Sequence, residues 1–376
     1  MDATRLRFGL LGPLLVTTGD QTIELGSPKQ RAVLAMLLIN RNRAVGTESL
    51  IDATWDQSPV PAARTSIHSY VSHLRRRLAV AGADPNAVLA SAPPGYRLGV
   101  PDGDCDLDRF ITDKTAGIQA AAAGRFEQAS HHLLEALHQW RGPALDDLRN
   151  FAFVEAFATA LAEDHMLVHV ARAEAEIACG RANAIIGELE ALAAAHPYHE
   201  PLWAQLISAY YVAERQSDAL DAYRRLKAVL AEDLGIDPGP TLIALHARIL
   251  RQERLDTKQS AKTTAAGAMA FARAGSGRLL VDAALRDATG RQYPLRGAMT
   301  QIGRLPDNDI VLHDDDVSRH HAVILDNGGT FTITDLRSAN GVEVGHRPLT
   351  RSVTLADGDV IGICGHQFTF EIRRPQ

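Results

Sequence analysis

The chain has 376 residues, of which 46% are hydrophobic and 22% charged, and its formal net charge is −6. This length exceeds one ordinary hydrophobic core, so two or three domains are expected, and the composition excludes a disordered or fibrous chain. No apolar run reaches the ~20 residues that a membrane-spanning helix requires, so a cytoplasmic protein is expected.

Residues 5–100 mix short strands with helices. The runs FGLLGPLLVT and QTIEL are strand-like and are separated by a turn at Gly19-Asp20. Three helices and a closing hairpin are expected at residues 28–41, 47–55, 63–78 and 88–100. Residues 1–100 carry 11 Lys and Arg against 7 Asp and Glu. Because this segment is basic, a polyanionic partner is expected to bind here.

The order of these elements resembles the winged-helix (OmpR-like) domain of response-regulator effectors, and more closely that of the SARP antibiotic-pathway regulators. The segments that carry the resemblance are PKQRAVLAML, the helix 50–55, the loop DQSPVPA, ARTSIHSYVSHLRRRL and PPGYRL. The resemblance implies that the third helix enters the major groove of promoter DNA and that the hairpin, the wing, touches the adjacent backbone or minor groove.

The third helix has an apolar stripe and an opposite polar face. The stripe comprises Ile67, Tyr70, Val71, Leu74 and Leu78. The side chains expected to reach base edges are Thr65, His68, Ser69, Ser72, His73 and Arg76. The cations expected on phosphates are Arg64, Arg75, Arg77 and, from the wing, Arg97. A solvated basic helix end is the alternative interpretation, and His73 replaces the arginine that relatives often have.

Residues 106–252 are almost continuously helical in pattern and rich in alanine. The segments 180–197 and 214–231 align with a 34-residue offset, and 122–137 is a weaker copy. Such helix pairs bury their apolar faces only by stacking, which predicts a solenoid like that of tetratricopeptide (TPR) repeats. The aromatic residues expected in its core, rather than in a binding groove, are Trp140, Trp203, Tyr210, Tyr211 and Tyr223.

From Cys105 to about residue 252 the chain resembles the bacterial transcriptional activation domain that follows the winged helix in SARP regulators. The resemblance implies that this region packs against the head and supports homodimerisation or contact with RNA polymerase. Residues 255–276 are polar and small, which is typical of a linker. Residues 277–376 alternate short strand-like runs with turns, which predicts a β-sandwich or barrel.

Three motifs in the last segment carry the sharpest signal. They are Gly303-Arg304, Ser318-Arg319-His320-His321 and Ser338-Ala339-Asn340-Gly341. Their order and spacing resemble a forkhead-associated (FHA) domain. The resemblance implies an eleven-stranded sandwich whose loops at one end bind a phosphothreonine peptide, for example on a threonine-phosphorylated Ser/Thr protein kinase.

The residue types in these motifs suit a phosphate dianion, which needs a guanidinium fork and hydroxyl donors. Those donors would be Arg304, Ser318, Arg319 and Ser338. By resemblance Asn340 would bind the peptide backbone, and His321 would be a buried prop. Gly303 and Gly341 would permit backbone conformations that a side chain obstructs. Ala339 departs from the Thr or Ser of many relatives.

Catalytic and metal sites are not expected. The chain has no Walker, HExxH, GxSxG or CxxC motif, so neither an enzyme nor a cofactor is indicated. His196-Pro-Tyr-His199-Glu200 could suggest a metal, but Pro197 would break a helix that held both imidazoles. Cys105, Cys179 and Cys364 lack disulfide or metal spacing, so free thiols in a reducing compartment are expected.

The fold class expected is multidomain α+β, with a winged-helix head, an all-α TPR-like middle and an all-β FHA sandwich. The expected boundaries are 1–103, 104–254, 255–276 for the linker and 277–376. Two functions remain open. One is a DNA-binding transcriptional regulator whose FHA domain docks a threonine-phosphorylated kinase. The other is a kinase-binding adaptor or inhibitor with a vestigial head.

Overall fold

The computed structural model forms two compact units. One comprises Met1–Ile111, Gln139–Asp164 and Ala270–Gln376, and the other comprises Thr112–His138 and His165–Met269. The described residues are 5–55, 61–273, 283–295, 299–306, 308–326, 331–336, 338–349 and 352–372. Most of the expected loop DQSPVPA (residues 56–60), the end of the expected linker and the start of the last domain lie outside them.

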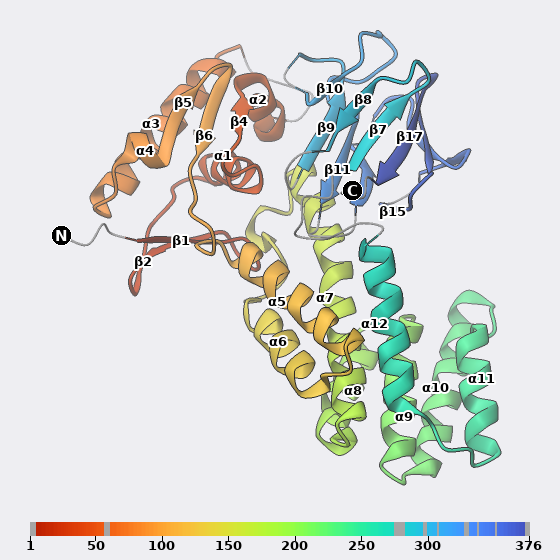
Figure 1. The fold of residues 1–376 in the computed structure, drawn as a ribbon. Helices are drawn as coiled ribbons and strands as arrows, with labels where there is room; N and C mark the ends of the chain where they lie inside the picture. Colours follow the sequence, from red (N-terminus) through yellow and green to blue (C-terminus); the bar gives the residue numbers. More distant parts are fainter. Residues whose placement is uncertain are drawn as a thin grey trace. The chain divides into compact units, whose positions relative to one another are not determined.

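The first unit begins with the head, in which helices pack beside two small sheets (Figure 1). Its strands are β1 (Leu6–Gly9), β2 (Leu15–Thr18), β3 (Gln21–Thr22), β4 (Ala44–Gly46), β5 (Leu89–Ala92) and β6 (Gly95–Leu98). Its helices are α1 (Pro28–Ile39), α2 (Thr47–Trp55), α3 (Ala63–Val80) and the short α4 (Pro85–Val88). The expected hairpin is β5–β6, and β4 joins it in the order β4-β6-β5.

Helix α1 is the centre of the head's core. Ser27 and Gln30 form a capping box at its start, with the Ser27 side chain accepting from the Gln30 amide and the Gln30 side chain accepting from the Ser27 amide. Every residue from Ala32 to Ile39 is buried. Because the helix is apolar on all sides in this stretch, α2, α3 and β6 can pack around it.

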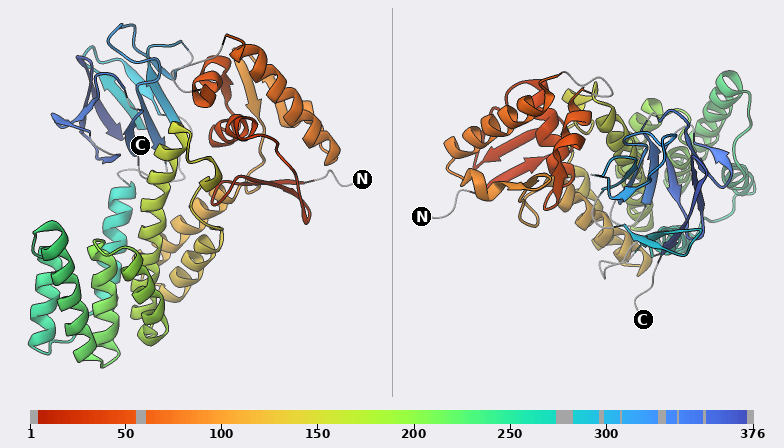
Figure 2. Two further views of the ribbon diagram at one scale, coloured as in Figure 1. Left: turned by 180° about the vertical axis from the view of Figure 1, so that it is seen from behind. Right: turned by 90° about the horizontal axis from the view of Figure 1, so that it is seen from above.

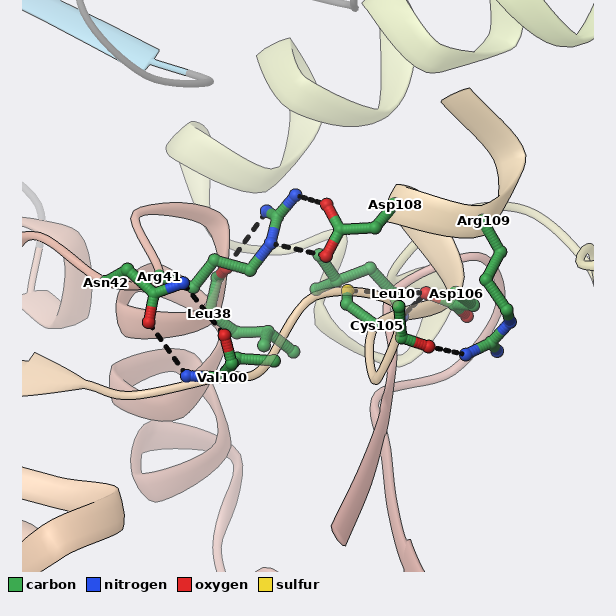
Figure 3. A network of polar contacts seen from close by, with 10 residues as sticks. Leu10, Leu38, Arg41, Asn42, Val100, Cys105, Asp106, Asp108 and Arg109 are labelled. Atoms are coloured by element: carbon green, nitrogen blue, oxygen red, sulfur yellow. Dashed lines mark hydrogen bonds and ion pairs between the residues drawn. The ribbon is translucent and has the colours of Figure 1, made fainter. Parts of the chain in front are cut away.

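The head continues without a break into the first turn of α5 (Asp106–Ala122), through a polar network (Figure 3). The backbone amides of Leu10 and Leu11 donate to the Asp106 carboxylate at 2.8 and 3.0 Å. Arg41 bonds Asp108 through its guanidinium. Asn42 exchanges two hydrogen bonds with the Val100 backbone. These contacts satisfy buried groups of the head from residues after 103.

The second unit contains most of the helical middle. Its helices are α6 (Phe126–His138), α8 (Ala182–Ala195), α9 (Glu200–Val212), α10 (Gln216–Leu234) and α11 (Pro240–Leu250), with parts of α5 and of the long α7 (Ala152–Ala178). Helices α8 to α11 run alternately in opposite directions side by side (Figures 1 and 2). Trp203, Tyr210 and Tyr223 are buried in their shared core, so the prediction that these aromatic residues are core is confirmed.

The prediction of a structureless linker is wrong in part, because α12 (Thr257–Arg273) occupies most of it. Asp256 begins this helix by accepting from the Gln259 amide at 2.9 Å. Ala261 packs on Phe126 and Ala178. Small alanines, rather than large apolar residues, form the buried side of α12, so the sequence lacks a visible hydrophobic stripe.

The C-terminal domain of the first unit is a β-sandwich. Its strands are β7 (Ala283–Asp287), β8 (Gln292–Pro294), β9 (Met299–Gly303), β10 (Ile310–Val311), β11 (Ala322–Asp326), β12 (Phe331–Asp335), β13 (Val342–Val344), β14 (Arg347–Pro348), β15 (Val353–Leu355), β16 (Val360–Ile363) and β17 (His366–Ile372). One sheet has the order β10-β9-β11-β12-β15 and the other β14-β13-β16-β17-β7-β8. Within the described ranges the domain thus has the eleven strands that the FHA resemblance implies.

Candidate functional site

The first motif lies where β9 ends beside the loop before β11. The backbone amide of Arg304 donates to the Ser318 carbonyl oxygen at 3.0 Å. A Cβ atom on Gly303 would meet the Arg319 carbonyl oxygen at 2.2 Å, which is far inside van der Waals contact. Glycine is therefore required at position 303 so that the two loops can approach each other closely.

Arg304 is exposed, and its guanidinium is aimed by the neighbouring loop. Its Nε donates to the Val317 carbonyl oxygen at 3.2 Å, and its Nη1 lies 3.3 Å from the Asp315 carboxylate. Asp315 is fully exposed. An ion pair with such a solvated carboxylate contributes little stability, so an incoming phosphate can replace it.

His321 is fully buried and connects the second and third motifs. Its Nδ1 accepts from the Ser318 amide at 3.1 Å, and its Nε2 lies 2.9 Å from the Gly341 carbonyl oxygen. Since a carbonyl can only accept, the proton is on Nε2 and the imidazole is neutral. The ring therefore fixes the spacing of the two loops.

The third motif forms a tight turn around Gly341, whose φ is +74°. The Ser338 Oγ accepts from the Gly341 amide at 2.9 Å, and the Ser338 amide donates to Asp335 at 3.0 Å. Asn340 is exposed, and its Nδ2 donates to the Asp316 carbonyl oxygen at 2.9 Å. This bond holds the Asn340 amide at the rim of the loops.

Asn308 is a structural residue of the site that the sequence analysis missed. It is 6% exposed. Its Nδ2 donates to the carbonyl oxygens of Leu305 and Arg319 at 2.9 and 2.8 Å, and its Oδ1 lies 2.9 Å from the His320 Nδ1. A single asparagine in a turn carries no sequence signal for this role, because its partners are backbone groups of another loop.

The structure brings the predicted phosphate-binding residues to one cavity of about 740 Å³. Arg304, Ser318, Arg319 and Asn340 line it. Ser338, Gly303, His321 and Gly341 stand behind the lining and shape the loops. Within the part of the chain that the structure describes, the exposed Arg319 guanidinium has no ion-pair partner. Two guanidinium groups, a hydroxyl and an amide at one cavity suit a phosphate ester beside a peptide backbone.

The predicted base-reading side chains form one exposed face of α3. This face comprises Thr65, His68, Ser69, Ser72, His73 and Arg76. The opposite stripe is buried except for Tyr70, which is half-buried and stacks on Trp55 with ring centroids 6.0 Å apart. His68 also contacts the wing, since its Nδ1 lies 2.5 Å from the Tyr96 hydroxyl.

The four predicted phosphate-binding arginines differ in their surroundings. Arg75 is half-buried and fastens α3 to the wing, donating to the Leu89 carbonyl oxygen at 2.9 Å and the Ser91 Oγ at 3.0 Å. Arg64 is paired with Glu48 on α2. Arg77 lies 3.7 Å from Glu24, and Arg97 is exposed on the central strand β6.

The thiols and the histidine cluster have structural surroundings. All three cysteines are free, and burial raises the pKa of the Cys105 thiol to about 12. His199 caps α9 by accepting from the Leu202 amide at 3.4 Å, and Glu200 accepts from the Gly239 amide at 2.7 Å. Among the described residues, no group of three metal-ligating side chains and no helix able to span a membrane is found.

Comparison with family models gives three matches along the chain. Residues 20–98 match the C-terminal domain of transcriptional regulatory proteins, residues 105–250 the bacterial transcriptional activator domain, and residues 300–364 the FHA domain. The fold and these matches define a transcriptional regulator that combines a winged-helix head, an activator domain and an FHA domain.

Comparison with individual proteins defines the family. The transcriptional regulatory protein EmbR of Mycobacterium tuberculosis is 64% identical over 372 residues, covering 98% of this chain and 96% of EmbR. MoaR1 of the same species is 52% identical over 68% of this chain and 82% of its own length. DnrI of Streptomyces peucetius is 31% identical over 71% of this chain and its full length. The chain belongs to the EmbR family of transcriptional regulatory proteins.

A solved structure of M. tuberculosis EmbR in complex with a low-affinity phosphopeptide has 62% sequence identity and a TM-score of 0.88, and covers 99% of each chain. The resemblance stated from the sequence, to SARP-type regulators with an FHA domain, is therefore confirmed. The named relatives are transcriptional regulators rather than enzymes.

Proposed function

We propose that this regulator binds promoter DNA through α3 and the wing and docks a threonine-phosphorylated Ser/Thr protein kinase through its FHA loops. Kinase signalling would thereby be coupled to transcription. The observation that carries the proposal is the meeting of Arg304, Ser318, Arg319 and Asn340 at one cavity, in loops held by His321 and Asn308. The phosphopeptide complex of M. tuberculosis EmbR supports the same ligand class.

The roles of the other parts follow from this proposal. Double-stranded promoter DNA would be bound in the cytoplasm by the exposed face of α3, with Arg76, Arg77 and Arg97 on or near phosphates. The domains would be residues 1–103, 104–254 and 277–376. The middle domain would support homodimerisation or contact with RNA polymerase. No catalytic step is assigned to the chain.

The test is a titration of an activated, threonine-phosphorylated kinase and its dephosphorylated form against the wild-type chain and Arg304→Ala. Binding that requires both the phosphate and Arg304 is expected. Equal binding in all four combinations, or none, would remove the kinase from the proposal and leave a DNA-binding protein without this input.

The adaptor alternative is favoured by one observation. Two of the four arginines expected on phosphates are engaged within the head, Arg64 with Glu48 and Arg75 with the wing. The two functions are separated by DNA binding of the intact chain. Sequence-specific binding that depends on Arg76 and Arg97 supports the regulator, and its absence supports the adaptor.

A further inference from the structure

The cavity at the FHA loops is not lined by FHA residues alone. Residues of the head also line it, among them Lys29 at the start of α1 and Asp52 and Trp55 on α2. Phe151 and Phe153, around the start of α7, complete the lining. All these residues belong to the same compact unit. The phosphate-binding loops therefore share one cavity with the DNA-binding head.

Two ion pairs connect the head to the FHA loops at this cavity. The His320 Nε2 lies 3.1 Å from the Asp52 carboxylate, and both side chains are largely buried. Arg43 pairs with Asp309 at 2.5 Å, and Asp309 in turn accepts from the Gln301 amide at 2.8 Å. His320 is itself held by Asn308. The contact is thus made by side chains that the FHA loops already position.

The wall opposite the phosphate ligands is aromatic. Trp55 stacks on Tyr70, and the Lys29 Nζ lies 4.5 Å from the Trp55 ring centroid. Phe151 and Phe153 have ring centroids 6.3 Å apart. Trp55 and Phe151 are both only partly buried, so they offer apolar area to a ligand. Aromatic side chains in such positions are the residues that most often anchor protein partners.

The size of the cavity exceeds what a phosphothreonine needs. Its volume of about 740 Å³ lies in the upper part of the range of pockets that enclose drug-sized ligands. A phosphate ester held by Arg304 and Asn340 would fill only the FHA side. The remaining space lies against Trp55 and Phe151, and the peptide that carries the phosphate is the ligand already brought to its edge.

We propose that the phosphothreonine site is completed by the head. An apolar, preferably aromatic, side chain flanking the phosphothreonine of the partner would occupy the space against Trp55 and Phe151. This inference rests on the proposed phosphopeptide binding and adds a specificity determinant outside the FHA domain. The intact chain then selects its partner by the phosphate and by one flanking side chain.

The test uses the full-length chain and three kinds of probe. These are phosphothreonine itself, a nine-residue phosphothreonine peptide with alanine at the flanking positions, and the same peptide with one phenylalanine placed at each flanking position in turn. At one position phenylalanine should raise the affinity about tenfold over the alanine peptide. Trp55→Ala and Phe151→Ala should remove this gain while phosphothreonine binds as before.

A matched control and a second readout keep the test independent of folding. Val80→Ala, at an exposed position of α3 outside the cavity, should retain the gain. A benzoylphenylalanine at the selected position should photo-crosslink to residues 49–55 or 150–153 of the wild-type chain. The inference is overturned if phenylalanine gives no gain at any position, if both variants retain it, or if the crosslink maps elsewhere.

Failure of the inference can be told from failure of the proposed function. If peptides bind through the phosphate and Arg304 but are insensitive to the flanking residue, only the composite site is lost. If no phosphopeptide binds the wild-type chain, or if Arg304→Ala binds equally well, the proposed function fails as well.

Discussion

The FHA loops and the exposed face of α3 are both polar surfaces, yet they are built differently. In the FHA loops nearly every group behind the ligands is fixed by another loop, as His321 fixes Ser318 and Gly341. On α3 the exposed side chains are positioned by the helix alone, and Ser72 merely donates to the His68 carbonyl oxygen one turn earlier. A preorganised site costs little ordering entropy on binding, whereas the α3 face must order its side chains on DNA.

The largest effect is expected in the preorganised region. Arg304→Ala should weaken phosphopeptide binding roughly 10- to 100-fold, or about 1.5–3 kcal/mol, because a charge-assisted hydrogen bond is lost. Calorimetric titration measures it. Arg347→Ala, at an exposed arginine of β14 that does not line the cavity, should bind like wild type. An unchanged Arg304→Ala would mean that the loops order something other than a phosphate site.

On the α3 face the expected effect is spread over several contacts. The double variant Arg76→Ala and Arg97→Ala should weaken binding to the DNA that the wild-type chain selects. It should also lower the salt dependence of the logarithm of the binding constant by about two phosphate contacts, at ~0.9 each. Fluorescence anisotropy at several salt concentrations measures both. Arg224→Ala on α10 is the matched control, and a double variant equal to it would favour the vestigial head.

Comparing the two regions across pH requires a group elsewhere to be controlled. Burial raises the pKa of Glu174 from its usual 4.5 to about 7, although hydrogen bonds from Thr264 and Gln205 oppose the shift. The stability linked to this raised pKa is complete below pH ~4.5 and is lost as the pH rises through about 7.

Glu174→Gln should therefore raise the free energy of unfolding at pH 8 by about 1–2 kcal/mol and leave it nearly unchanged at pH 5. Thermal unfolding at the two pH values measures this difference. Glu163→Gln, at an exposed position of the same helix, should show no such pH dependence. A gain at both pH values would point to improved packing rather than titration.

The smallest expected effect separates Arg75 from its neighbours. Arg75→Ala should lower the free energy of unfolding by about 1 kcal/mol, because two hydrogen bonds to the wing are lost. Arg76→Ala, at the adjacent exposed position, should leave stability unchanged. Chemical denaturation of both variants decides the matter, and equal stability would return Arg75 to the set of free phosphate-binding cations.

The sequence predicted best those features that depend on local pattern. The helices of the head, the repeat of α8 and α10 and the three FHA motifs each lie within a short stretch. The features it missed depend on distant partners. Helical spacing placed Arg75 on the polar face but could not show that β5 lies beside it. Asn308 and Trp55 owe their positions in the site to loops far away in the chain. Helix α12 was missed because alanines such as Ala261 give no hydrophobic stripe.

The carboxylate of Asp106 has a practical consequence for dividing the protein. It accepts from the amides of Leu10 and Leu11 and pairs with Arg141 at 3.2 Å, while only 3% of the residue is exposed. A fragment that stops at residue 103 would leave those two amides without their acceptor, at about 1–3 kcal/mol each. The head is therefore not an interchangeable module. A head transplanted between relatives must bring residues up to at least Arg141 with it.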